Sequence, residues 1–352
     1  MLFNYFSLVN ALSCLIGNAE AVRRIVHNLN EPTVPSFMDD FPDPAIILTG
    51  DTWWAYATNA NGTNIQLAST TKEAFDGRWK RHVGYDVLPS LPAWVRQNRS
   101  DVWAPSVVQT SPNNFVMYFS ATWDKEPKFH CLGTATSSTP DGIFTPSPEP
   151  FACPLDVGGA IDASGFLDPV TKKRFVTYKI DGNSLGSGGT CNNGFWPRKN
   201  TPLVLQEVSA DGIQKIGNPI NLLNREDVDG PSIEAPSIAY INEKYFLFYS
   251  SNCFDSGFYD VRFATSSAVA GPYKKGGKLL ISPNLGLINP GGAETTIDGK
   301  FVTFHAGPPG KRYMYTGRMT FDGDNTVTIC TNGGCRSAEA DGEELGDVKD
   351  EY

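Results

Sequence analysis

The sequence predicts an all-β protein, and more specifically a five-bladed β-propeller. Helical periodicity is nearly absent after residue 30, and short β-rich segments are separated by turns rich in Gly, Pro, Asn and Asp. The composition agrees, with 34 Gly and 25 Pro in 352 residues. A strand–turn–strand unit recurs about every 50–70 residues, which is the spacing expected of propeller blades with about four strands each.

Each repeat consists of a β-strand, a tight turn and a second strand that is richer in aromatic residues. Five copies can be aligned, the last of them the weakest, at residues 43–56, 104–118, 162–178, 234–249 and 292–305. Five copies in order predict five blades around one axis. The alternative is a two-sheet sandwich with coincidental repeats, whereas an α/β sheet is excluded because alternating helices are missing.

The two ends of the chain differ from the repeats. Residues 1–21 begin with a long apolar run and end in Ala-Glu-Ala, which fits a secretory signal peptide, with a buried N-terminal helix as the alternative. Residues 336–352 carry seven acidic residues and are expected to form a disordered acidic tail. We therefore expect the propeller to span residues 22–335.

Charge and hydropathy limit the partners. The net charge of −9 argues against nucleic-acid binding. Apart from the N-terminus, no apolar run approaches the roughly 20 residues that cross a bilayer. We expect a secreted, extracellular monomer that binds neither nucleic acid nor membrane.

Cysteine usage supports an oxidising compartment. Cys14 lies within the expected signal peptide, and an even number, six, remains. Fifteen connectivities are possible. The local pairs Cys131–Cys153 and Cys330–Cys335 are the interpretation we favour, which leaves Cys191 for Cys253. Glycosylation sequons begin at Asn61 and Asn98.

Three acidic residues lie close to the starts of the predicted innermost strands, at the same position of their repeats. They are Asp43, Asp162 and Glu234. A single acid at a strand start usually caps a turn or faces solvent, but the innermost strands of a propeller converge around one axis. We therefore expect the three side chains to share one pocket, where like charges shift each other's pKa.

Carboxylates with divided roles are what hydrolysis of a glycosidic bond requires. One acid must be protonated to donate to the leaving oxygen, and another must be ionised to activate water. A third can raise the pKa of the donor by repulsion between like charges. Trp53, Trp54 and Trp103 lie near these strands and are candidates for stacking on sugar rings, with core packing as the alternative for each.

Five short motifs resemble the sequential blade motifs of glycoside hydrolase family 43. They are Phe-Pro-Asp-Pro at 41–44, Val-Trp-Ala-Pro at 102–105, Ile-Asp-Ala-Ser at 161–164, Ile-Glu-Ala-Pro at 233–236 and Phe-His-Ala-Gly at 304–307. Each is weak alone, but five in order carry the resemblance over about residues 37–330. It implies a five-bladed propeller that hydrolyses arabinofuranosides or xylosides with inversion.

The resemblance also implies roles for individual residues. Asp43 matches the general base, Glu234 the general acid, and Asp162 the carboxylate that tunes the acid and orients the substrate. His305 matches a histidine of the axial channel near a calcium ion or its water shell, and Arg318 matches a late arginine that faces the pocket. A core histidine and a surface ion pair are the respective alternatives for the last two.

The implied substrate is arabinan, arabinoxylan or a pentose oligosaccharide. Because no β-sandwich domain follows residue 335 in the sequence, we expect an α-L-arabinofuranosidase or arabinanase rather than a β-xylosidase. Trp53, Trp103 and Arg318 are the predicted substrate contacts. No cofactor is expected to be required, with a structural calcium in the central channel, near His305, as the possible metal.

Three other interpretations remain. Gly-Asn-Ser-Leu-Gly at 182–186 matches the nucleophile elbow of serine hydrolases around Ser184, but such an elbow opens into a helix and here a loop is predicted to follow. A non-catalytic sugar-binding propeller would share the fold and the aromatic residues without needing three acids. A transferase acting on sucrose, from a related five-bladed clan, would need a carboxylate nucleophile.

Overall fold

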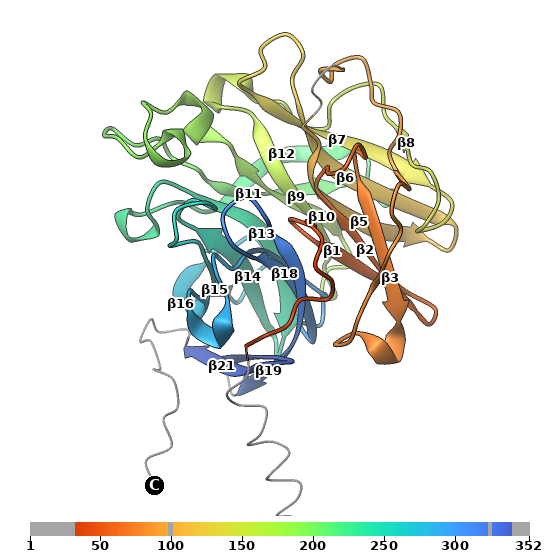
Figure 1. Ribbon diagram of the computed structural model, residues 1–352. Coiled ribbons are helices and arrows are strands. Elements are labelled where there is room, and N and C mark those ends of the chain that lie inside the picture. Colours follow the sequence, from red (N-terminus) through yellow and green to blue (C-terminus); the bar gives the residue numbers. More distant parts are fainter. Residues whose placement is uncertain (1–31, 98–100, 323–325, 340–352) are drawn as a thin grey trace, which may run out of the picture.

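The computed structural model describes residues 32–97, 101–322 and 326–339. Five antiparallel sheets surround a central axis (Figure 1), which confirms the predicted five-bladed β-propeller. In each sheet the strands follow one another in chain order. Each predicted repeat supplies the first two strands of one blade.

The first three blades contain four strands each. Blade 1 consists of β1 (Ala45–Thr49), β2 (Thr52–Ala57), β3 (Gln66–Thr71) and β4 (Lys80–Arg81); blade 2 of β5 (Trp103–Ser111), β6 (Asn114–Thr122), β7 (His130–Ser137) and β8 (Thr145–Pro146); and blade 3 of β9 (Ala160–Leu167), β10 (Arg174–Ile180), β11 (Leu203–Val208) and β12 (Lys215–Leu223).

Blade 4 also has four strands, and blade 5 has five. They are β13 (Ile233–Ile241), β14 (Lys244–Ser251), β15 (Asp260–Ser266) and β16 (Lys274–Leu280), then β17 (Gly291–Thr295), β18 (Phe301–Ala306), β19 (Tyr313–Asp322), β20 (Thr326–Thr331) and β21 (Gly334–Glu339). Short 3-10 helices lie in the connections: η1 (Lys72–Ala74), η2 (Leu155–Val157), η3 (Gly182–Leu185), η4 (Thr190–Asn192), η5 (Asp227–Asp229) and η6 (Asn284–Gly286).

The ring closes between blade 5 and blade 1. Each innermost strand contacts the innermost strands of both neighbouring blades, and β17 contacts β1. The segment that precedes β1 is hydrogen-bonded along blade 5, where Ser36 N–H donates to the carbonyl of Met314 and Phe41 N–H to that of Arg312. The first blade is thereby joined to the last.

One residue near the start of each innermost strand has a left-handed backbone. The φ angles lie between 42° and 59° at Asp43, Ala104, Asp162, Ala235 and Gly292. Because a non-glycine residue in this conformation costs about 1–2 kcal/mol, an interaction elsewhere must offset it.

A hydrogen bond across the blade boundary supplies that interaction. The backbone N–H of each left-handed residue donates to a side chain of the preceding blade. We call these five hydrogen bonds the inter-blade latches: Ala104 to Thr58 Oγ1 (2.9 Å), Asp162 to Ser120 Oγ (3.0 Å), Ala235 to Asp162 Oδ2 (3.1 Å), Gly292 to Ser250 Oγ (2.9 Å) and Asp43 to His305 Nδ1 (3.1 Å).

The latches correct the predicted equivalence of the three acids. Asp43 and Asp162 occupy the left-handed position, but their equivalent in blade 4 is Ala235, so Glu234 stands one residue earlier. Successive residues of a strand point to opposite sides. The side chain of Glu234 therefore has different neighbours from those of Asp43 and Asp162.

Apolar side chains fill the space between neighbouring blades. The described residues form five buried apolar clusters, one at each boundary between adjacent blades. At the boundary of blades 5 and 1, for example, Trp53 packs against Phe75 and Phe301 with ring centroids 4.9 and 5.0 Å apart. The core is therefore divided into radial layers that hold the sheets at fixed positions around the axis.

All three predicted disulfides are confirmed: Cys131–Cys153, Cys191–Cys253 and Cys330–Cys335. The predicted start of the tail at residue 336 is wrong, because β21 continues to Glu339 and pairs with β20. Residues 340–352, the predicted signal peptide and the Asn98 sequon lie outside the described residues, while Asn61 is exposed in the β2–β3 loop. Among the described residues, no helix has the length and apolar character needed to cross a membrane.

The latches predict an effect on stability. Ser120 is fully buried and accepts the N–H of Asp162. Replacing Ser120 by Ala leaves that N–H without an acceptor and is expected to lower the free energy of unfolding by about 1–3 kcal/mol. The measurement is denaturant unfolding. Ser138→Ala, at an exposed position, is the control and is expected to change stability by less than about 0.5 kcal/mol; equal effects of the two substitutions would contradict the role of the latch.

Candidate active site

A pocket lies on the axis at the end where the innermost strands begin. The left-handed residues of all five blades line it, each with the residue that follows. Asp43 and Asp162 are therefore both in the pocket wall, and Ala235 brings Glu234 beside it. The predicted convergence of the three acidic segments is confirmed, with Glu234 offset by one residue.

Asp43 is surrounded by groups that favour its ionised form. Thr58 Oγ1 donates to Oδ2 at 2.6 Å, and Arg312 Nη1 lies 3.4 Å from both carboxylate oxygens. Burial alone would raise the pKa of this carboxyl, but the charge of Arg312 and the hydrogen bond from Thr58 hold it well below its usual range. Asp43 is thus an ionised carboxylate at neutral pH.

Glu234 is fixed through both carboxylate oxygens. Oε2 lies 2.8 Å from Lys179 Nζ, and Oε1 accepts from the Tyr259 hydroxyl at 2.8 Å. Lys179 is fully buried and also contacts Asp181 Oδ1 at 3.0 Å. Burial would lower the pKa of Lys179, but Glu234, Asp181 and Asp162 raise it, so the ammonium keeps its charge. A buried cation therefore orients Glu234.

Asp162 has the opposite tendency to Asp43. Burial raises the pKa of its carboxyl well above the usual range, the nearby charge of Glu234 raises it further, and Lys179 offsets only part of this. Its Oδ2 accepts the latch hydrogen bond from Ala235, directly after Glu234. Burial and the neighbouring carboxylate thus favour the protonated form of Asp162, and its side chain is held against the strand that bears Glu234.

A fourth acid, Glu294, lies in the same pocket and was not predicted. It is two residues after the left-handed Gly292, where blades 2, 3 and 4 carry serine and blade 1 carries alanine. Its Oε1 accepts from Ser106 Oγ at 2.6 Å and Ser164 Oγ at 3.2 Å, and its Oε2 from Ile46 N–H at 3.0 Å. One side chain thus connects four blades.

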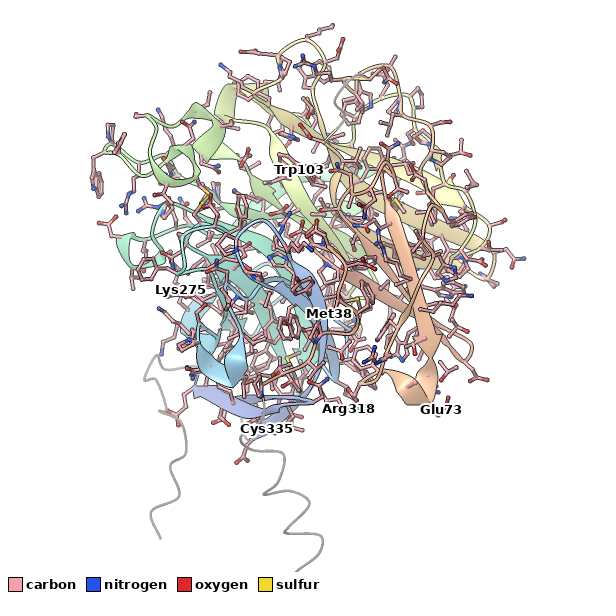
Figure 2. The ribbon with its side chains drawn as sticks, viewed as in Figure 1. Met38, Glu73, Trp103, Lys275, Arg318 and Cys335 are labelled. Carbon is pink, nitrogen blue, oxygen red and sulfur yellow. A yellow bond between two sulfur atoms is a disulfide. The ribbon has the colours of Figure 1, made fainter. Side chains whose placement is uncertain are left out.

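Two of the predicted substrate contacts are wrong. Trp53 is 1% exposed and belongs to the apolar cluster between blades 1 and 5. Arg318 pairs with Asp76 at 2.5 Å and covers the ring of Phe301. In Figure 2 Arg318 lies near the lower edge of the molecule, well below Trp103. Trp53 therefore packs in the core and Arg318 forms a surface ion pair, which are the alternative interpretations given for these two residues.

The other two tryptophans differ from each other. Trp54 donates through Nε1 to Thr49 Oγ1 at 3.0 Å and packs in the cluster between blades 1 and 2. Trp103 immediately precedes Ala104 of the pocket wall, and its ring stacks on His130 with centroids 3.8 Å apart. Trp103 is only partly buried, so its predicted role in binding substrate stays a prediction.

Three residues that sequence reasoning missed contact the candidate carboxylates. Arg312, in the β18–β19 loop, takes the position predicted for Arg318, since that loop and His305 lie at the same end of blade 5. Lys179 is a charged residue between Tyr178 and Ile180 in β10, which was the available signal. Tyr259 precedes β15 and offered no signal in the sequence.

The arrangement around His305 does not fit direct binding of a metal ion. Nδ1 accepts the N–H of Asp43, so the ring hydrogen of the neutral imidazole is on Nε2, which is buried without a partner among the described residues. In this form Nε2 donates a hydrogen and does not ligate a cation. The imidazole fits contact with a water molecule, including one in the hydration shell of a cation.

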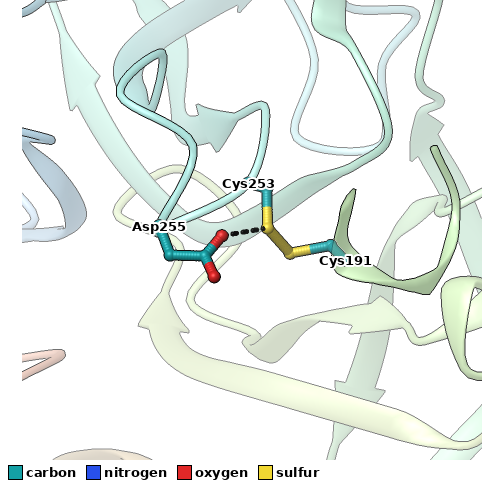
Figure 3. Close-up of side chains that lie close together, drawn as sticks. All are labelled: Cys191, Cys253 and Asp255. Atoms are coloured by element: carbon teal, nitrogen blue, oxygen red, sulfur yellow. Dashed lines mark hydrogen bonds between the residues drawn. A yellow bond between two sulfur atoms is a disulfide. The ribbon is translucent and has the colours of Figure 1, made fainter. Parts of the chain in front are cut away.

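The described residues contain one other group with metal-binding side chains, and it is not a metal site either. Cys191, Cys253 and Asp255 lie within 4.8 Å of one another, but the two sulfurs are bonded to each other (Figure 3). Disulfide sulfur is not the thiolate that binds metals.

The serine-hydrolase interpretation finds no support in the local structure. Residues 182–185 form the 3-10 helix η3, and the hydroxyl of Ser184 donates to the carbonyl of Gly158 at 2.7 Å. A nucleophile elbow places its serine between a strand and an α-helix.

The fold and the pocket together define a class of protein, that of five-bladed propellers with acidic side chains on the axis. The chain belongs to glycosyl hydrolases family 43, whose sequence profile matches residues 30–322. This confirms the resemblance found in the blade motifs.

Two extracellular arabinanases are similar in sequence. An extracellular endo-α-(1→5)-L-arabinanase of Thermotoga petrophila is 27% identical over 256 residues, which cover 66% of this chain and 50% of that protein. Extracellular endo-α-(1→5)-L-arabinanase 1 of Bacillus subtilis is 21% identical over 276 residues, or 75% and 79% of the two chains. The match thus spans half of the Thermotoga protein.

Solved structures share the fold. A thermostable family-43 glycoside hydrolase superposes with a TM-score of 0.68 at 21% identity, covering 85% of this chain and 96% of that one. An exo-1,5-α-L-arabinanase from a bovine ruminal metagenomic library gives a TM-score of 0.61 at 20% identity, covering 83% and 99%.

Glu294 predicts a pH-dependent stability. Burial raises the pKa of its carboxyl to about 7, although Ser106, Ile46 N–H and Ser164 favour the charged form. Because the folded protein holds this proton more tightly than the unfolded chain, the stabilisation is complete below the ordinary pKa of 4.5 and is lost as pH rises through 7. The melting temperature of the wild type, relative to that of Glu294→Gln, should therefore fall as pH rises from 4.5 to about 7 and stay constant at higher pH. The measurement is thermal unfolding of both proteins from acidic to alkaline pH. A stability difference that does not change with pH would contradict the assignment.

Proposed function

We propose that the protein is a secreted glycoside hydrolase that cleaves pentose glycosidic bonds of arabinan with inversion at the anomeric carbon. Asp43 is the general base, Glu234 the general acid, and Asp162 the carboxyl that tunes Glu234. The observation that carries the proposal is geometric: Asp43, paired with Arg312, and Asp162 line one axial pocket, and Glu234 is held beside it by Lys179 and Tyr259.

The contacts of each carboxylate support these roles. Asp43 removes a proton from the attacking water, and Arg312 and Thr58 hold its two oxygens in place. Glu234 donates a proton to the departing oxygen. The Tyr259 hydroxyl on its Oε1 can rotate from donor to acceptor, so it accommodates both protonation states of that oxygen. Lys179 keeps the side chain in one orientation.

The names of the relatives support the substrate and the compartment. Both similar proteins are named as extracellular arabinanases. Three disulfides agree with an oxidising compartment and hence with secretion. We propose that the enzyme acts as a monomer and requires no cofactor, and that a calcium ion, if one binds, contacts His305 through water.

Substitution of either proposed catalytic carboxylate is expected to abolish most of the activity. Asp43→Asn and Glu234→Gln should each lower kcat on linear arabinan by roughly 10²–10⁴-fold, because proton transfer is lost while the shape of the side chain is kept. The assay measures reducing sugar released, with thermal unfolding as the check on folding. Arg318→Ala is the matched control and should keep near-normal kcat, since Arg318 pairs with Asp76 at the surface. Near-normal activity of a folded Asp43→Asn or Glu234→Gln protein would remove that residue from the mechanism.

Stereochemistry tests the proposed function directly. Inversion needs room for a water molecule between base and sugar, with the two carboxyl groups roughly 6.5–9.5 Å apart. Proton NMR of the first sugar released from an arabino-oligosaccharide should therefore show the anomeric configuration opposite to that of the substrate. Retention would point to a carboxylate nucleophile, as in a sucrose transferase. Release of no sugar at all would favour a binding propeller.

A further inference from the structure

The loop of residues 252–259 reaches both sides of the candidate active site. It joins β14 to β15 in blade 4. At one end of the loop, the ring of Phe254 lies 5.3 Å from the guanidinium carbon of Arg312, which contacts Asp43. At the other end, Tyr259 donates to Glu234. A single loop thus contacts Glu234 directly through Tyr259 and reaches Asp43 through Phe254 and Arg312.

Phe254 presents an open aromatic ring beside this pocket. Its side chain is 45% exposed, although it stacks on Arg312. The guanidinium covers part of the ring, and the remainder faces solvent. An exposed aromatic ring is common by itself. This ring, however, contacts Arg312, and Arg312 contacts the carboxylate of Asp43.

The loop is held in place before any ligand binds. Cys253, next to Phe254, is bonded to Cys191 of η4 in the long β10–β11 connection of blade 3 (Figure 3). Within the loop, Ser256 donates through both its N–H and its hydroxyl to the carbonyl of Cys253. These restraints limit the conformations of the loop in the free protein, which lowers the cost of ordering it on binding.

We propose that Phe254 is a sugar-binding platform, on which a pentofuranosyl unit of the arabinan chain stacks next to the unit being cleaved. The inference rests on the proposed function and names a specificity residue for that site. Sugar rings present C–H groups on their faces and hydroxyls at their edges. An aromatic ring with a guanidinium at one side offers a surface for the face and hydrogen-bond donors for the edge.

The experiment separates binding of a longer chain from catalysis. Phe254→Ala should raise KM for long linear arabino-oligosaccharides roughly five- to tenfold, in line with the loss of one stacking contact, while kcat stays within about twofold. Phe254→Trp should restore KM because it restores an aromatic face. A fall in kcat with unchanged KM would instead make Phe254 a residue that positions Arg312, and would overturn the platform.

A matched control is available on the same loop. Phe258 is 74% exposed, and its ring is not the one stacked on Arg312. Phe258→Ala should leave KM unchanged. An equal rise in KM for both variants would overturn the assignment to Phe254. The exposed ring of Phe254 could instead contact a second copy of the chain, which analytical sedimentation of wild type and Phe254→Ala tests. A dimer that forms in the wild type and is lost in Phe254→Ala would overturn the proposal.

The disulfide supplies a second, independent variant. Replacing Cys191 and Cys253 by Ser frees the loop and should raise KM in the same direction as Phe254→Ala. Replacing Cys330 and Cys335, which link β20 and β21 in the outer part of blade 5, should not. A KM that does not respond to loss of the Cys191–Cys253 bond would contradict the preorganised platform.

Failure of the platform can be told apart from failure of the proposed function. Calorimetric titration of arabino-oligosaccharides into Glu234→Gln, with and without Phe254→Ala, measures binding without cleavage. Weaker binding of the double variant supports the platform even if wild type releases no sugar. Equal binding by the two proteins, or no binding by either, overturns the platform. If the wild type releases sugar and Phe254→Ala does not change KM, only the platform fails and the proposed hydrolase activity stands.

Discussion

The structure depends on a backbone N–H that each blade gives to the blade before it. Five residues adopt a left-handed conformation at the start of an innermost strand, and each directs its N–H to a side chain across the boundary. This constraint sets the spacing of the blades and also the shape of the axial pocket, because the same residues line it. The backbone N–H groups of Asp43 and Asp162 form latches, and their side chains are acids of the site. The same residues therefore stabilise the fold and line the pocket.

The electrostatic design of the pocket is uneven. On one side Asp43 is paired with Arg312, and on the other Lys179 is buried against Glu234. Buried charges are tolerated only when paired and hydrogen-bonded, and removing one partner leaves the other uncompensated. Asp162 and Glu294 avoid that cost differently, because burial favours their protonated forms. Four acids can therefore occupy one small volume without four negative charges.

The sequence was sufficient for the blade number, the disulfides and the convergence of the acids, because these follow from repeats and from local spacing. It was insufficient for side-chain direction. The repeat pattern places Glu234 level with Asp43, but the left-handed residue of blade 4 is Ala235. Trp53 lies on the face of β2 that packs against Phe301 of blade 5. Arg312 and Arg318 both lie in or beside β19, and only register tells which end meets the axis.

The route of the chain into blade 1 has a consequence for heat tolerance. The segment that leads to Asp43 is held along blade 5 by separate hydrogen bonds, such as those of Ser36 and Phe41, and by the buried ring of Phe41, rather than by a continuous strand. Glu234 and Asp162 instead lie within the innermost strands β13 and β9, each of which is hydrogen-bonded to the next strand of its sheet. Fraying of this entry segment would displace the proposed base while the other blades remain intact. Such local unfolding would remove the proposed base before the propeller as a whole unfolds.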